Sequence, residues 1–96
     1  MNAQQKQDLR HVCLEFLAMR HPTAHGARAV RRTVARELDF AIAEDEVTGI
    51  LEFLHQLGLV RVELDPLGST KYFAATPAGV LAHERGLQPQ PPEPVD

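Results

Sequence analysis

Four arginines stand close together between residues 28 and 36 and are the residues of this sequence best suited to bind an anion. They are Arg28, Arg31, Arg32 and Arg36. Because an α-helix turns by about 100° per residue, a helix through this segment places all four within about 140° of arc. Such a row of guanidinium groups suits phosphate groups or an acidic protein surface. The alternative is an ordinary solvated face, partly neutralised by Glu37, Asp39 and other acids.

Five histidines and one cysteine are the other residues that could take part in chemistry, as metal ligands or as a nucleophile. His21 and His25 are four residues apart, but Pro22 breaks the helical geometry that would align them on one ion. No Cys/His cluster has zinc spacing, so we expect no metal and no cofactor. No nucleophile–base pair, carboxylate dyad or glycine-rich phosphate loop is present, so the sequence does not predict an enzyme.

Apolar residues recur at helical spacing over several segments, which predicts four helices. These helices are expected over residues 3–19, 27–38, 44–57 and 77–85. Cys13 lies on the apolar stripe of the first helix, so we expect a buried thiol rather than a redox sensor. Gly58 and Gly86 follow the third and fourth helices, where glycine commonly ends a helix. The segment HPTAHG, from His21 to Gly26, is expected to be a loop.

Three short segments predict β-structure because their apolar residues alternate or border turn residues. Residues 59–64 and 71–74 flank the turn sequence DPLGS and are expected to pair as a hairpin. Phe40 and Ile42 alternate with alanines, which predicts a short strand between the second and third helices. The predicted order is therefore helix, helix, strand, helix, strand, strand, helix. This is a mainly α-helical fold with a small β-hairpin.

The third predicted helix, EDEVTGILEFLHQ, contains no lysine or arginine and begins with three acids. Carboxylates in a first turn are stabilised by the helix dipole, at about 0.3–1 kcal/mol each. They compensate for Ala43, which is a poor N-cap, together with a hydrophobic staple between Ile42 and Val47. The outward face of this helix contains Asp45, Thr48, Gly49, Glu52, His55 and Gln56.

Two residues of this helix invite a functional interpretation. An exposed glycine costs a helix about 1 kcal/mol relative to alanine. Gly49 therefore indicates either the close approach of a DNA backbone or partner helix, or neutral drift. Phe53 lies at the margin of the apolar stripe, where it completes the core or, if partly exposed, anchors an interface.

Length and composition exclude several classes of protein. A chain of 96 residues with a hydrophobic fraction of 44% is typical of one soluble domain. We expect that domain over residues 1–86, followed by a disordered tail, LQPQPPEPVD, that is rich in proline. No apolar run approaches the roughly 18 residues of a membrane span. With no signal-peptide segment at its start and a single cysteine, the protein is expected to be cytoplasmic.

The formal net charge of −3 hides an uneven distribution. Residues 1–36 hold seven Lys/Arg against two acids, whereas residues 37–96 hold three against eleven acids. The sequence therefore predicts a dipolar molecule whose positive half includes the four arginines.

Two stretches resemble the winged helix-turn-helix domain. VTGILEFLHQLGLVRVE resembles its third helix, which runs through a glycine into the first wing strand. STKYFAATPAGVLAHERG resembles the second wing strand and the "T-x-x-G" helix start of many prokaryotic members. The resemblance covers about residues 5–86 and does not specify one family. It implies a DNA-binding transcriptional regulator, with the third helix in the major groove and the wing along the backbone or minor groove.

Two functions stay open on these observations. The first is binding to double-stranded DNA as a homodimer, with base contacts from Thr48, His55 and Gln56. Its phosphate contacts would come from Arg28, Arg31, Arg32, Arg36, Arg61 and Lys71. The lack of cations in the third helix weighs against it, because phosphate neutralisation supplies most sequence-independent affinity. The second is a protein-interaction module whose partner is basic or is the arginine face of another copy. Its interface would contain Asp45, Gly49, Glu52 and Phe53.

Overall fold

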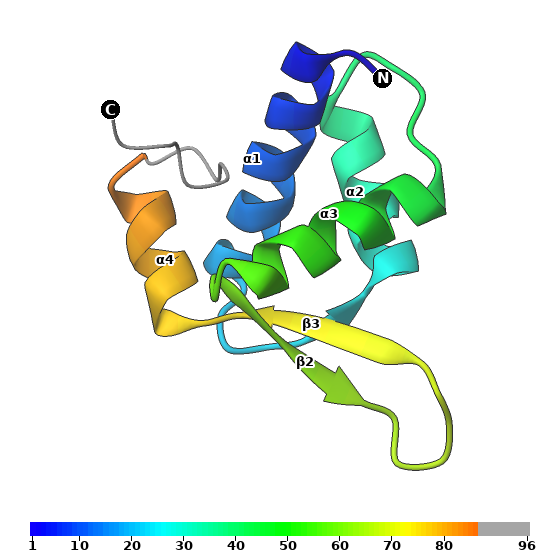
Figure 1. Cartoon of the computed structure of the whole chain (residues 1–96), viewed down its shortest axis with the longest axis vertical. Helices are drawn as coiled ribbons and strands as arrows, with labels where there is room; N and C mark the ends of the chain where they lie inside the picture. Colours follow the sequence, from blue (N-terminus) through cyan, green and yellow to red (C-terminus); the bar gives the residue numbers. More distant parts are fainter. Residues whose placement is uncertain (87–96) are drawn as a thin grey trace.

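The computed structural model describes residues 1–86, in which a helical bundle stands above an antiparallel hairpin (Figure 1). Its elements are α1 (Ala3–Met19), β1 (His25–Gly26), α2 (Ala27–Glu37), α3 (Glu44–Gln56), β2 (Val60–Leu64), β3 (Lys71–Ala75) and α4 (Pro77–Glu84). The mainly α-helical fold with a β-hairpin is thus confirmed. The predicted tail, residues 87–96, lies outside the described residues. Within residues 1–86, no helix is long and apolar enough to cross a bilayer.

The helix α1 begins and ends where the apolar spacing predicts. Its start is fixed by a reciprocal cap, in which Asn2 Oδ1 accepts the Gln5 N–H at 2.8 Å and Gln5 Oε1 accepts the Asn2 N–H at 3.1 Å. Its inner face carries Leu9, Cys13 and Leu17, all fully buried. Burial raises the pKa of the Cys13 thiol to about 12, because the apolar core disfavours the thiolate. The expectation of a buried thiol is confirmed.

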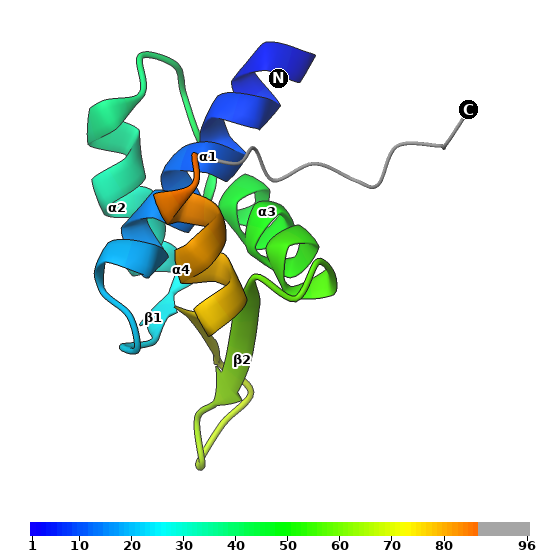
Figure 2. The ribbon, with the colours of Figure 1, turned by 90° about the vertical axis from the view of Figure 1, so that its left-hand side faces the viewer.

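The helices α2 and α3 complete the core against α1. Val30 and Val34 of α2 and Val47, Leu51 and Leu54 of α3 are each inaccessible to solvent. These residues recur at spacings of three and four, so each helix turns one apolar stripe inward and leaves its other face to solvent. The bundle therefore presents the arginine face of α2 and the acidic face of α3 on the surface. Figure 2 shows α3 beside α1, with the hairpin extending below both.

The strands of the described residues form one antiparallel sheet in the order β1-β3-β2. In the hairpin, Val60 pairs with Ala75 and Leu64 pairs with Lys71. Phe73, at the centre of β3, is 1% exposed and joins the core beneath the helices. The hairpin is therefore anchored at its base and extends freely at its turn, which makes it the wing.

The position of the first strand was predicted wrongly. It is not at Phe40 and Ile42 but at His25–Gly26, within the segment expected to be a loop, where His25 pairs with Phe73. Within residues 1–86, the sheet consists of β1, β3 and β2 and does not include the Phe40–Ile42 segment. Ile42 instead inserts into the core at 4% exposure, and its carbonyl accepts a hydrogen bond from Arg31 Nε at 2.7 Å. The alternation of apolar residues there reflects a buried anchor in a loop rather than a strand.

The helix α4 closes the fold against the junction between α3 and β2. The Thr76 hydroxyl accepts the Gly79 N–H at 3.1 Å and donates to the Gly58 carbonyl at 2.7 Å. The Thr76 N–H also donates to the Leu59 carbonyl at 3.0 Å. A Cβ atom on Gly79 would overlap that same carbonyl. The T-x-x-G segment is thus a helix cap whose glycine permits close packing. Gly58 ends α3 with a φ of 77°, as the sequence predicts.

Candidate nucleic-acid interface

The outward face of α3 is the one that the sequence predicts. Asp45, Gly49, His55 and Gln56 are exposed, and Thr48 and Glu52 are half-buried at the edges of this face. Phe53 is also half-buried and packs against the core. Figure 1 shows the helix α3 above the hairpin of β2 and β3.

A hollow opens on the surface where the start of α2, the first half of α3 and the start of β3 meet. Its lining consists of Gly26, Ala27, Arg28, Glu44, Thr48, Thr70, Lys71 and Phe73. Three of the residues predicted to contact nucleic acid, Arg28, Thr48 and Lys71, therefore converge although they come from three separate elements. We call this site the α2–α3–wing hollow.

The start of α2 contributes more than the arginine side chain to this hollow. Gly26 is the N-cap of α2 and makes no side-chain cap hydrogen bond. The first backbone N–H groups of a helix have no partner within the helix and carry partial positive charge. With Gly26 and Ala27 in the lining, the hollow combines this helix terminus with the charges of Arg28 and Lys71.

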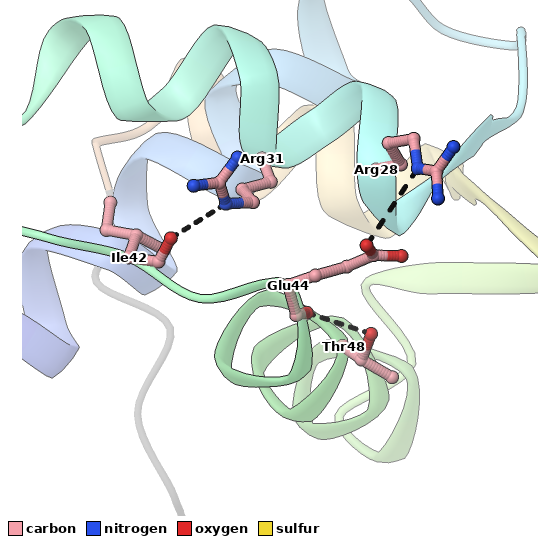
Figure 3. Close-up of polar contacts among 5 residues, drawn as sticks. All are labelled: Arg28, Arg31, Ile42, Glu44 and Thr48. Atoms are coloured by element: carbon pink, nitrogen blue, oxygen red, sulfur yellow. Dashed lines mark hydrogen bonds and ion pairs between the residues drawn. The ribbon is translucent and has the colours of Figure 1, made fainter.

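Each of these two cations faces a carboxylate of α3. Arg28 Nε lies 3.9 Å from Glu44 Oε2 (Figure 3), and Lys71 Nζ lies 2.9 Å from Glu52 Oε1. The paired side chains are 81% and 52% exposed in the first pair and 50% and 34% exposed in the second. Exposed pairs of this kind contribute about 0–1 kcal/mol, because solvent screens them. The acids therefore lower the local charge without holding the cations tightly.

The residues predicted to contact bases make local hydrogen bonds. Thr48 Oγ1 donates to the Glu44 carbonyl one turn earlier, at 3.1 Å (Figure 3). His55 Nδ1 donates to the Val60 carbonyl at 3.1 Å, which ties the end of α3 to β2. Neither His55 nor Gln56 is among the residues that line the hollow. The base-contact candidates are therefore spread along α3, with Thr48 at the hollow and the other two near its C-terminal end.

The four arginines of α2 are all exposed, as predicted, but they do not act alike. Arg31 holds the loop before α3 through its bond to the Ile42 carbonyl (Figure 3). Arg28, Arg32 and Arg36 follow one another at intervals of four residues and form a row, which we call the arginine ridge. Among the described residues, neither Arg32 nor Arg36 forms a salt bridge. The ridge thus leads away from the hollow along α2.

Arg61 stands apart from the hollow. Its guanidinium donates from Nη2 to the Pro22 carbonyl at 3.1 Å, and Nη1 lies 3.0 Å from Glu63 Oε1. Arg61 is thus occupied between β2 and the loop after α1. The predicted phosphate contact at this position is not brought together with Arg28 and Lys71.

Sequence reasoning missed two features of this surface. Thr70 lines the hollow because β3 pairs with β1, which brings the start of β3 beside the start of α2. Arg10 of α1 stacks its guanidinium 4.2 Å from the centre of the Phe53 ring, on α3. Both features depend on contacts between segments far apart in the chain, and no local pattern signals either of them.

No protein-family model matches this chain, and no curated protein is a significant match. Solved structures do match. A probable transcriptional regulator from Pseudomonas aeruginosa aligns with a TM-score of 0.64 and 20% identity, over 81% of this chain and 53% of that one. MepR, a transcription regulator of the Staphylococcus aureus multidrug efflux pump MepA, aligns with a TM-score of 0.65 and 13% identity, over 85% and 62%.

A third match is CouR from Rhodococcus jostii RHA1, solved bound to p-coumaroyl-CoA, with a TM-score of 0.59 and 25% identity over 79% of this chain and 50% of that one. The chain has the winged helix-turn-helix fold. The resemblance drawn from the third helix and the wing is thereby confirmed. This winged helix-turn-helix chain spans between 50% and 62% of the length of the three structures.

Proposed function

We propose that this winged-helix domain binds double-stranded DNA as part of a transcriptional regulator, and that the α2–α3–wing hollow holds a backbone phosphate. The observation that carries the proposal is the convergence of Arg28, Lys71 and the uncapped start of α2 around one hollow. Helix N-termini flanked by cations are ready anion sites. Two of the matched structures are described as transcriptional regulators, which supports the same conclusion.

A phosphate reaches this site by displacing the two carboxylates of α3. The exposed pairs with Glu44 and Glu52 contribute little free energy, whereas a phosphate forms charge-assisted hydrogen bonds, bidentate with arginine. Arg32 and Arg36 extend the positive surface along α2 toward further phosphates. In this arrangement the acids keep the free domain nearly neutral at the hollow. When DNA binds, its phosphates replace these carboxylates beside the two cations.

In this proposal, residues on the exposed face of α3 contact the bases. Thr48, His55 and Gln56 carry hydroxyl, imidazole and amide groups that can hydrogen-bond base edges in the major groove. Gly49 presents no side chain and lets the helix approach the DNA backbone closely. Because α3 contains no lysine or arginine, the phosphate contacts from α2 and the wing supply most of the affinity.

Retardation of a pool of random-sequence duplexes at about 50 mM salt is the experiment that tests DNA binding. We expect retardation that weakens steeply with added salt, and a weaker complex with the Arg28→Ala or Lys71→Ala variant. Arg85→Ala, an exposed arginine at the end of α4, is the matched control and should bind as the unmodified chain does. No retardation of any duplex at this salt concentration would overturn the proposal.

The exposed acids of α3 favour one other function, a protein-interaction module. In that case α3 faces a basic partner or the arginine ridge of another copy, with Asp45, Gly49, Glu52 and Phe53 at the interface. The double variant Asp45→Lys/Glu52→Lys separates the two functions. It strengthens DNA binding if α3 lies against phosphates, and it abolishes self-association or capture of a partner if the acids form the interface.

A further inference from the structure

A second pocket lies on the opposite flank of α3 from the hollow, between α3 and the first half of α1. At 100° per residue, Glu46, Gly49 and Phe53 lie on one flank of α3, whereas Glu44, Thr48 and Glu52 lie on the other. The pocket has a volume of about 250 Å³. We call it the α1–α3 pocket, and the phosphate site proposed above makes no use of it.

The walls of the α1–α3 pocket are mostly apolar. Leu9 of α1 and Ile50 of α3 are buried, and Phe53 of α3 is half-buried, so carbon atoms of both helices form the floor. Small-molecule sites are typically concave and apolar, with a few polar groups that fix the orientation of the ligand. The size of this pocket restricts a ligand to a body of about one ring or a short aliphatic chain.

The polar groups of the pocket favour an anion. Lys6 and Arg10 of α1 line it, and the Arg10 guanidinium lies 4.2 Å from the centre of the Phe53 ring. Arg10 Nε is buried and has no hydrogen-bond acceptor among residues 1–86. The Glu46 carboxylate also lines the pocket, but it accepts the Ala43 N–H at 2.9 Å as part of the cap of α3. The lining thus carries two cations against one carboxylate, so it suits a ligand that brings an anionic acceptor to the Arg10 guanidinium.

Gly49 keeps the pocket open on the α3 side. A Cβ atom built at this position meets no atom within 4 Å, and Gly49 belongs to the lining of the pocket. An exposed glycine in the middle of a helix costs stability, and an unfilled pocket beside it gives that cost a physical reason. The same residue offers a way to fill the pocket without disturbing the core.

We propose that the α1–α3 pocket binds a small organic monocarboxylate. Its apolar body lies on Leu9, Ile50 and Phe53, and its carboxylate accepts hydrogen bonds from Arg10, with Lys6 beside it. Because half of the pocket belongs to α3, an occupant contacts the helix that is proposed to face DNA. Binding of the carboxylate does not depend on that function and is measured in the absence of DNA.

An amide-resolved NMR titration of the full chain with benzoate tests this inference, with benzyl alcohol as the uncharged probe of similar shape. We expect saturable shifts centred on Gly49, Phe53 and Arg10. We also expect the affinity for benzyl alcohol to be lower by about tenfold, because it cannot form the charged hydrogen bonds. Shifts that do not saturate, that centre on Arg28 and Lys71, or that are equal for the two probes would overturn the inference.

Two variants and a control variant test whether the ligand binds in the α1–α3 pocket. Gly49→Leu fills the pocket from the open side and should abolish the saturable shifts from both probes. Arg10→Gln removes the charge and should bring the affinity for benzoate down to that for benzyl alcohol. Arg32→Gln, on the exposed arginine ridge, should bind benzoate as the unmodified chain does. Unchanged benzoate affinity in both Gly49→Leu and Arg10→Gln would contradict the assignment of the pocket.

Discussion

At the scale of single residues, two helical glycines differ in the space around them. A Cβ on Gly79 would overlap the Leu59 carbonyl, whereas the Cβ position of Gly49 is open. The first glycine allows α4 to pack on the α3–β2 junction. The second lies at the rim of the α1–α3 pocket, where no packing contact depends on it. Substitution of each by alanine should therefore change stability in opposite directions.

Gly79→Ala is expected to lower the free energy of unfolding by about 1–3 kcal/mol, because the added methyl group forces the packed backbone apart. Gly49→Ala is expected to raise it by up to about 1 kcal/mol, because alanine favours the helix and meets open space. Urea denaturation of the two variants measures both effects. A loss of stability in Gly49→Ala would show that its surroundings are not open.

His25 predicts how stability depends on pH. Burial, and secondarily the charge of Arg20, lower its pKa, and its ring packs edge-on against Phe16 at 5.0 Å. A histidine whose pKa is lowered in the folded state binds a proton more readily when unfolded. Stability is therefore retained above the unfolded pKa of about 6.5 and falls as the pH drops below it.

We expect the urea concentration at the denaturation midpoint to decrease as the pH is lowered from 7.5 to 5.5. The His25→Gln substitution should make this decrease smaller. His83→Gln, on the partly exposed face of α4, is the matched control and should leave the pH dependence unchanged. An identical pH dependence in His25→Gln and the unmodified chain would rule out His25 as the cause.

At the scale of elements, helices were predictable and the first strand was not. The bounds of α1 and the start of α3 follow from apolar spacing and from caps, which are local properties of the chain. The strand β1 has two residues and exists only because it pairs with β3, so no local pattern indicates it. The residues of the α2–α3–wing hollow were likewise predictable from local sequence, whereas their arrangement in space was not. Arg28, Thr48 and Lys71 were identified one by one, but their convergence depends on the pairing that places β3 beside α2.

The connection between α2 and α3 depends on one side chain. Arg31 Nε donates to the Ile42 carbonyl at 2.7 Å, and Ile42 is buried. Arg31→Ala is expected to destabilise the domain by about 1–3 kcal/mol, because the carbonyl loses a charged donor. Arg32→Ala, one residue further along the exposed face, should change stability by less than about 0.5 kcal/mol. Equal effects of the two substitutions on the thermal midpoint would contradict this role of Arg31.

At the scale of the whole molecule, the arrangement of charge matters more than its sum. The net charge is −3, yet the cations gather on α1 and α2 and the acids on α3 and beyond. The fold sets these two groups side by side, so that Glu44 and Glu52 each neutralise a cation of the hollow. We therefore expect the proposed DNA binding to be an exchange of counterions at a specific site rather than attraction to a uniformly basic surface.

The salt dependence of DNA binding tests this account most directly. Each cation that neutralises a phosphate contributes about −0.9 to the slope of log K against log salt concentration. We expect the double variant Arg28→Ala/Lys71→Ala to bind duplex DNA with a slope shallower by about 2 than that of the unmodified chain, with Arg85→Ala unchanged. A double variant whose slope equals that of the unmodified chain would show that no phosphate occupies the α2–α3–wing hollow.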